Sequence, residues 1–263
     1  MKFYGREGIC YEIPAENEPF EEETHGWIKP VNGHPNLAAK LYHQDALMNG
    51  RDKEKEEKLK VLLEWRTPHH VHERVILPQD LLYDSQGRFR GYLRELPEGY
   101  TTLAEVLCQL RRINTRDKIR ITRELISAIQ MVHEMDAVCG NLHRQHILLS
   151  PGYQTVKLTG AEYFLLRDPE NGEYYDYGSD PPRNPHTGLR IGRIPDDLAL
   201  ANHMKKLFEP EICKWKLPYW ERTFFMAFLN GMNNPLKRPD LTHYSMMLNQ
   251  MEQFLNEKEE KEK

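Results

Sequence analysis

Cysteine is scarce in this 263-residue chain, and no two cysteines are close enough in sequence to form a C-x-x-C pair. The four that occur are Cys10, Cys108, Cys139 and Cys213. Such wide spacing argues against a framework of disulfides and against a zinc site built on thiolates. Reduced thiols are the simple interpretation, and they favour a cytoplasmic protein.

Long apolar runs and an excess of charge of one sign are also missing. No apolar stretch approaches the roughly 20 residues that cross a bilayer, and the first residues, MKFYGREG, lack the pattern of a signal peptide. The 36 Lys and Arg against 40 Asp and Glu leave a net charge of −4, and glutamates lie among the basic residues of 51–60. We therefore expect neither a membrane nor a nucleic acid among the partners.

The first hundred residues have the alternation and the short apolar runs that are typical of β-strands. Strands are expected at 8–13 and 36–43, and two more, joined by a turn, at 73–96. One helix is expected at 52–65, and the acidic stretch 15–26 predicts a loop or a flexible insertion. This part of the chain is therefore expected to be a sheet with one helix.

The rest of the chain has the periodicity of helices. Thr102 and Glu105 form a capping-box pattern, and Asn114 can cap the long helix that follows it. The apolar segment 218–232 predicts a buried helix, and the charged end 257–263 predicts a solvated or frayed tail. The fold class is therefore α+β, with a β-rich first part and a larger, mostly helical second part.

Several of these segments, in this order, resemble the signature set of protein kinases. LAAKLY is similar to the strand that carries the phosphate-binding lysine, NLHRQHILLS to the catalytic loop, and PDDLALA to a helix of the large lobe. The chain is similar to the bacterial Ser/Thr protein kinase domain over most of its length. The resemblance implies one bilobal domain, with a small lobe over 1–97, a larger helical lobe over 98–256 and a charged tail over 257–263.

The segment FYGREGICY resembles the glycine-rich loop that covers the ATP phosphates in kinases. Gly5 and Gly8 match its second and third glycines, whereas Phe3 stands where the first is expected and Cys10 where a valine is expected. Glycines let the backbone approach a phosphate closely, and a phenylalanine opposes that approach. From the residues alone, a plain β-turn is the alternative.

A lysine on a strand and a glutamate on the next helix form the second nucleotide-binding part. Lys40 matches the lysine that holds the α- and β-phosphates, and its partner is expected to be Glu56, with Glu57 as second choice. The alternative is an ordinary strand lysine whose ammonium lies in solvent. ATP is the cofactor that this resemblance implies, bound weakly and without Mg²⁺ if it is bound at all.

The positions that perform phosphoryl transfer in kinases hold other residues here. Asn141 replaces the catalytic aspartate, and a neutral amide is not a base near pH 7. His146 replaces the asparagine that binds the second Mg²⁺, and Gly160 replaces the metal-binding aspartate. Glu162 is a weak candidate for a metal ligand, and no other metal-binding residue is expected. His143 and His146 could form half of a metal site or an alternative acid/base pair; the other interpretation is drift after catalysis was lost.

The remaining matches are structural. Asp196 resembles the helix aspartate that holds the backbone of the catalytic loop, and Arg238 resembles the arginine before the last helix. The tyrosine-rich segment 172–188 is either a partner surface or an ordinary surface loop. A histidine cluster at 69–72 is expected to be a polar loop, because no cysteine or carboxylate completes a metal site.

These replacements favour a pseudokinase: a kinase-like domain that is catalytically inactive and acts as a regulatory or protein-binding module in bacterial signalling. Its partner is expected to be a phosphatase, an active kinase or another signalling protein. The alternative is an atypical ATP-dependent phosphoryl or nucleotidyl transferase that uses Lys40 and Glu56 with Glu162 or His146. A helical interaction protein with an accidental resemblance is a third hypothesis, and it requires the first hundred residues to be mostly helical.

Overall fold

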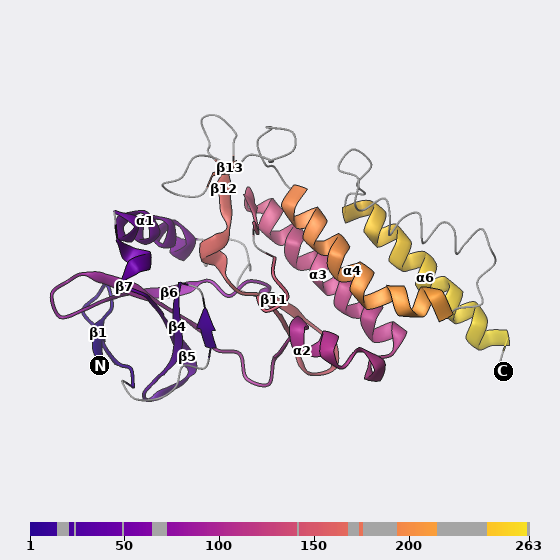
Figure 1. Ribbon diagram of the computed structural model, residues 1–263, viewed down its shortest axis with the longest axis horizontal. Coiled ribbons are helices and arrows are strands. Elements are labelled where there is room, and N and C mark those ends of the chain that lie inside the picture. Colours follow the sequence, from indigo (N-terminus) through magenta and orange to yellow (C-terminus); the bar gives the residue numbers. More distant parts are fainter. Residues whose placement is uncertain are drawn as a thin grey trace.

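The first part of the chain folds into a curled antiparallel sheet of seven strands (Figure 1). The strand order is β2-β1-β6-β7-β5-β4-β3. The strands are β1 (Lys2–Tyr4), β2 (Cys10–Glu12), β3 (Glu21–Glu23), β4 (Gly26–Val31), β5 (His34–Tyr42), β6 (Pro78–Tyr83) and β7 (Phe89–Glu95). This computed structural model describes residues 1–14, 21–23, 25–48, 50–64, 73–140, 142–167, 174–175, 194–214 and 241–261.

The expectation of a β-rich first part is confirmed, which rules out the hypothesis of a mostly helical one. The expectation of a loop over 15–26 is wrong at β3, which pairs with β4 at the edge of the sheet. Charged residues are common on edge strands, where they discourage pairing with other chains. Acidic composition therefore does not distinguish such a strand from a loop.

The two central strands, β5 and β7, give the sheet two different faces. Ala39 and Leu41 point to one face, where they join Leu93 in a small apolar cluster. Lys40 points to the other face and is paired in register with Tyr92. Because side chains alternate along a strand, a lysine between two apolar residues must lie on the opposite face from them.

Helix α1 (Arg51–Glu64) packs against the face that carries Lys40, as Figure 1 shows. Its buried residues include Leu59 and Leu62, which share a cluster with Leu81 and Tyr92 of the sheet. The helix expected at 52–65 is therefore present, and its apolar side is the one that the periodicity predicts.

The second part of the chain is mainly helical, and α3 (Thr115–Glu134) contacts both α4 (Ile194–Lys214) and α6 (Leu241–Lys261) (Figure 1). The short helix α2 (Leu103–Cys108) begins with the predicted capping box of Thr102 and Glu105. Asn114 accepts a hydrogen bond from the amide of Asp117 and caps α3, as predicted.

Short strands complete this part in two three-stranded sheets. One sheet holds β8 (Thr101–Thr102), β10 (Ile147–Leu149) and β11 (Val156–Leu158), and the other holds β9 (Ala137–Val138), β12 (Leu165–Arg167) and β13 (Tyr174–Tyr175). A 3₁₀ turn, η5 (Ala161–Tyr163), lies between β11 and β12. The fold class is therefore α+β, as expected.

One apolar core joins the sheet to the helices. It runs without interruption from Leu59 of α1 and Tyr92 of β7 to Leu125 of α3, Met204 of α4 and Met247 of α6. Because so many buried groups are shared, we expect the two parts to unfold together.

Several sequence predictions are settled only in part. The expected tail starts inside α6, which continues to Lys261, so residues 257–261 are helical. The buried helix predicted at 218–232 and the histidines at 69–72 lie outside the described residues. In the part of the chain that the structure describes, no helix has both the length and the apolar character needed to cross a bilayer.

Candidate functional site

Lys40 lies in a buried polar cluster between the large sheet and the turn η5. Its side chain is fully buried, and Nζ lies 3.5 Å from Oε1 of Glu162. The other carboxylate oxygen of Glu162 accepts a hydrogen bond of 2.7 Å from the hydroxyl of Tyr92. Three elements that are far apart in sequence, β5, β7 and η5, therefore meet at one carboxylate.

The charge on Glu162 is maintained by these contacts. Burial raises the pKa of its carboxyl, but the Lys40 ammonium and the Tyr92 hydrogen bond outweigh burial and bring the pKa below its ordinary value of 4.5. Burial and the neighbouring carboxylate raise the pKa of Tyr92 well above 10, so its hydroxyl remains a donor. The cluster is therefore an ion pair at neutral pH.

The carboxylate beside Lys40 is not the one expected from the sequence. Glu56 instead accepts a hydrogen bond of 2.9 Å from the Tyr83 hydroxyl and forms an ion pair with Lys60 at 3.0 Å, four residues along α1. Glu57 also pairs with Lys60. The structure thus places Glu56 and Glu57 on a different side of α1 from the buried cluster, and Glu162 beside Lys40.

Gly5 and Gly8 lie in the turn between β1 and β2, which is not close to Lys40. Strands β6 and β7 separate this hairpin from β5 in the sheet. The amide and guanidinium of Arg6 bind the carboxylate of Asp80 on β6, and a side chain at Gly5 would collide with that carboxylate. The missing side chain of Gly5 therefore allows the backbone to approach Asp80 of the same chain.

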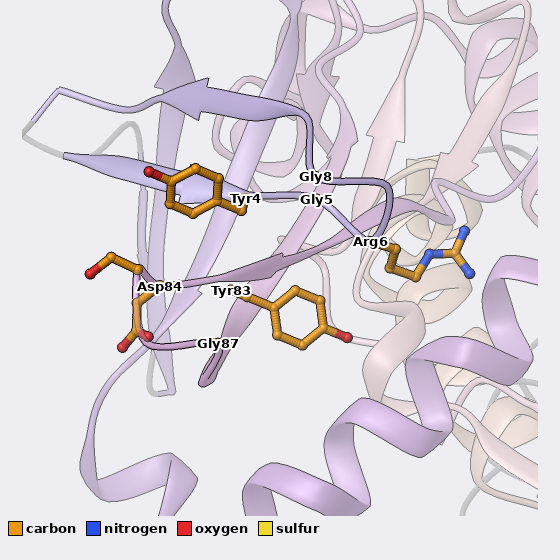
Figure 2. A pocket seen from close by; sticks show the side chains of 8 residues that line it. Tyr4, Gly5, Arg6, Gly8, Tyr83, Asp84 and Gly87 are labelled. Carbon is orange, nitrogen blue, oxygen red and sulfur yellow. The ribbon is translucent and has the colours of Figure 1, made fainter.

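The hairpin instead borders a surface pocket of about 550 Å³, shown in Figure 2. The β1–β2 turn lies on one side of it and the β6–β7 turn on the other. The lining residues are Tyr4, Gly5, Arg6, Gly8, Tyr83, Asp84, Ser85 and Gly87. Phe3, which replaces the first expected glycine, is buried in the small apolar cluster of the sheet. The structure therefore does not bring Gly5 and Gly8 together with Lys40.

Gly160 has a left-handed backbone conformation (φ = 76°) and leaves room for two rings. His146 stacks on Tyr163 with ring centroids 5.4 Å apart, and a Cβ at Gly160 would touch both rings. The His25 ring, in the turn between β3 and β4, lies 6.3 Å from Tyr163. His143 lies edge-on to His146 at 6.1 Å. His146 and Gly160, the positions that the resemblance matches to the metal ligands of kinases, are thus neighbours here, and the space beside Gly160 is filled by the stack of His146 on Tyr163.

These residues fit a divalent metal poorly. Each oxygen of Glu162 already has a contact within the protein, and Gly160 offers no side-chain ligand. Within the described ranges, no three His, Cys, Asp or Glu side chains are grouped so that they could hold a metal ion. Mg²⁺ prefers several oxygen ligands in octahedral geometry, which this arrangement does not offer.

Asp196, in the first turn of α4, holds the segment where the catalytic loop is expected. Its fully buried carboxylate accepts hydrogen bonds from the amides of Cys139 at 2.8 Å and Gly140 at 3.1 Å. The same carboxylate lies 2.9 Å from Nε2 of His133, near the end of α3. One side chain therefore joins α3, α4 and the loop, as the resemblance implies for this residue.

His203 holds the same loop from the next turns of α4. Its Nε2 lies 2.9 Å from the carbonyl oxygen of Leu142, while Nδ1 is enclosed without a hydrogen-bond partner. Burial lowers the pKa of His203; the Leu142 carbonyl opposes this effect, and the nearby Lys206, His143 and Arg144 add to it. The folded protein therefore favours the neutral ring.

We predict that acidification destabilises the fold through His203. A folded-state pKa below 6.5 means that the unfolded chain binds the proton first, so the free energy of unfolding falls as pH drops below about 6.5. One such group contributes at most about 1.4 kcal/mol per pH unit. Urea unfolding at pH 7.5 and 5.5 measures the loss, and His203→Gln should reduce it. An equal loss in both proteins would contradict the assignment.

Two expected site residues, Asn141 and Arg238, lie outside the described residues. The tyrosine-rich segment 172–188 is described only at β13, which pairs with β12. In contrast, Tyr92 and Arg94 are part of the buried polar face and were not predicted from the sequence. Their spacing of two residues on a strand was the available signal, because it places both side chains on one face.

Comparison with known proteins gives no family for this arrangement. No protein-family model and no curated protein matched the chain. Two features of the chain itself therefore bear on its function: the buried Lys40–Glu162–Tyr92 cluster and the loop held by Asp196.

Proposed function

We propose that this chain is a bilobal, protein kinase-like domain that lacks phosphoryl transfer and acts as a regulatory or protein-binding module. The order of parts supports the kinase-like fold: a sheet with a buried strand lysine, one helix packed on that sheet, and a helical part whose aspartate holds a loop. The proposal covers 1–97 as the small lobe and 98–256 as the large lobe.

The main observation in support of an inactive domain is the burial of the Lys40 side chain. This residue resembles the lysine that binds ATP phosphates, yet its ammonium is fully buried against Glu162. The position of the metal-binding aspartate is Gly160, and the space beside it is taken by His146 and Tyr163. Phosphoryl transfer depends on positioning and on neutralising charge with metal ions, and these residues offer neither.

The proposed role is then binding, with a phosphatase, an active kinase or another signalling protein as the partner class. A kinase-like domain without transfer can act only through what it contacts. ATP binding, where it occurs, is independent of metal in this proposal, because the carboxylate nearest to Lys40 is committed to the ion pair.

We expect the unfolding midpoint to respond to ATP equally in Mg²⁺, Mn²⁺ and EDTA, and we expect no transfer of labelled γ-phosphate or nucleotide to the chain or to a generic substrate protein. A ligand that binds the folded state must raise the midpoint, so thermal unfolding measures binding directly. His146→Ala is the matched variant, because the alternative transferase needs His146 or Glu162 as its metal ligand. A shift that requires metal, or transfer that His146→Ala abolishes, would replace this proposal with the transferase.

A further inference from the structure

Arg94 is a buried arginine on the face of the sheet that also carries Lys40. It lies on β7, paired in register with Ala38 of β5 on one side and Pro78 of β6 on the other. The residue is only 7% exposed. It is two residues from Tyr92, so both side chains leave the strand in the same direction.

The guanidinium of Arg94 lacks the partners that buried arginines normally have. Its Nε is enclosed without a hydrogen bond, and no described residue forms a hydrogen bond or ion pair with its side chain. Only Nε is both enclosed and unpartnered, which leaves the two terminal nitrogens at the open side of the group. A buried charge without a partner is costly, and arginines in protein interiors are almost always paired.

The neighbouring carboxylates all have other partners. Glu162 binds Lys40 and Tyr92 through its two oxygens. Asp80, on β6, binds Arg6. Glu95, the next residue on β7, forms an ion pair with Lys157 at 2.8 Å and lies on the other face of the strand. None of these carboxylates forms a hydrogen bond or ion pair with Arg94, although Glu162 interacts with it electrostatically: the guanidinium helps to lower the pKa of the Glu162 carboxyl.

We propose that Arg94 binds a small oxyanion, a carboxylate or phosphate group, through the terminal nitrogens of its guanidinium. The planar fork of two N–H donors matches both groups in a bidentate arrangement. An arginine with 7% exposure admits a small ligand rather than the surface of a macromolecule. Glu162 faces two cations, Lys40 in an ion pair and Arg94 through a weaker electrostatic interaction, so one positive charge remains for the ligand's negative charge to neutralise. This site does not depend on the kinase-like assignment.

The test is thermal unfolding of the wild type with inorganic phosphate, succinate or AMP, each against sodium chloride at matched ionic strength and without metal. We expect at least one of these anions to raise the midpoint by about 5 °C once it exceeds its Kd roughly 100-fold. A shift with both phosphate and AMP would indicate that the site prefers a phosphate group. A shift with succinate alone would indicate that it prefers a carboxylate.

Arg94→Met should abolish this shift, and without any anion it should raise the midpoint, because it removes an unpaired buried charge. Arg94→Lys keeps the positive charge but loses the planar pair of N–H donors. Calorimetric titration of this variant with the preferred anion should therefore give a Kd about tenfold higher than that of the wild type. This measurement tests the site even if Arg94→Met does not fold. The matched control is Arg88→Met, since Arg88 is exposed and pairs with Asp84 at the β6–β7 turn. The absence of any shift in the wild type, or equal shifts in both Arg94 variants, would overturn the proposal.

Discussion

Asp196→Ala is expected to lower the free energy of unfolding by about 4 kcal/mol. The substitution removes the acceptor of the buried amide of Cys139 and of the partly buried amide of Gly140, and it removes the partner of His133. A buried donor that loses its acceptor costs about 1–3 kcal/mol, and three such groups are affected here. Urea unfolding at neutral pH, followed by far-UV circular dichroism, measures the loss.

The matched control is Asp197→Ala, the next residue in the same first turn of α4. It removes the same charge near the same helix terminus but leaves the acceptor of the loop amides in place, so it should cost less than Asp196→Ala. Asp196→Asn should resemble Asp196→Ala more than the wild type, because one amide oxygen cannot replace two carboxylate oxygens that accept from three donors. If Asp196→Ala and Asp197→Ala cost the same, Asp196 would be an ordinary helix residue and not the group that holds this loop.

The elements of the fold were largely predictable because their signals are local. A capping box at Thr102, a cap at Asn114 and the apolar period of α1 each depend on residues within one or two turns. The clearest errors concern the edge hairpin: β3 was expected to be a loop, and β4, with which it pairs, was not predicted as a strand. The pairing partner is close in sequence, but three consecutive glutamates in β3 lack the apolar alternation that indicates a strand.

Only some members of the site were predictable, and their pairing was not. Lys40 and Glu162 were candidates from the sequence, whereas Tyr92 was not. Whether Glu56 or Glu162 faces Lys40 depends on how α1 and η5 pack against the sheet. Glu56 is half-buried on another side of α1, where the Tyr83 hydroxyl and Lys60, four residues along the helix, bind its carboxylate. Glu162 follows a glycine with positive φ, and this turn directs the chain back towards the sheet. Neither fact is encoded in spacing alone.

In the proposed kinase-like domain, the residues that hold the fold are different from those at the positions that perform phosphoryl transfer in kinases. The groups that position the loop are intact and buried, as Asp196 and His203 show. The groups that would handle phosphate and metal either face each other, as Lys40 and Glu162 do, or are replaced by a ring stack beside Gly160. This division is what the proposed binding role leads us to expect.

Lys40→Met is the second substitution with a large expected effect, a loss of about 3–5 kcal/mol in the free energy of unfolding. It leaves the charge on buried Glu162 without the Lys40 ammonium, so that only the Tyr92 hydrogen bond, the backbone amide of Glu162 and the Arg94 guanidinium still favour that charge. Without the ammonium, burial dominates and raises the pKa of that carboxyl, so the variant's deficit relative to the wild type should shrink as the pH is lowered towards 5. Urea unfolding at pH 7.5 and pH 5 measures both effects.

A double variant distinguishes a broken ion pair from lost packing. Lys40→Met combined with Glu162→Leu removes both charges and keeps most of the volume, so it should recover to within about 2 kcal/mol of the wild type. Lys60→Met is the control on an exposed pair, and it should cost less than about 1 kcal/mol because the Lys60 ammonium is largely solvated. If the double variant were as unstable as the sum of its two single variants, Lys40 and Glu162 would contribute independently. In that case the ion pair would not be the reason why, in the proposed function, the Lys40 ammonium does not bind a nucleotide phosphate.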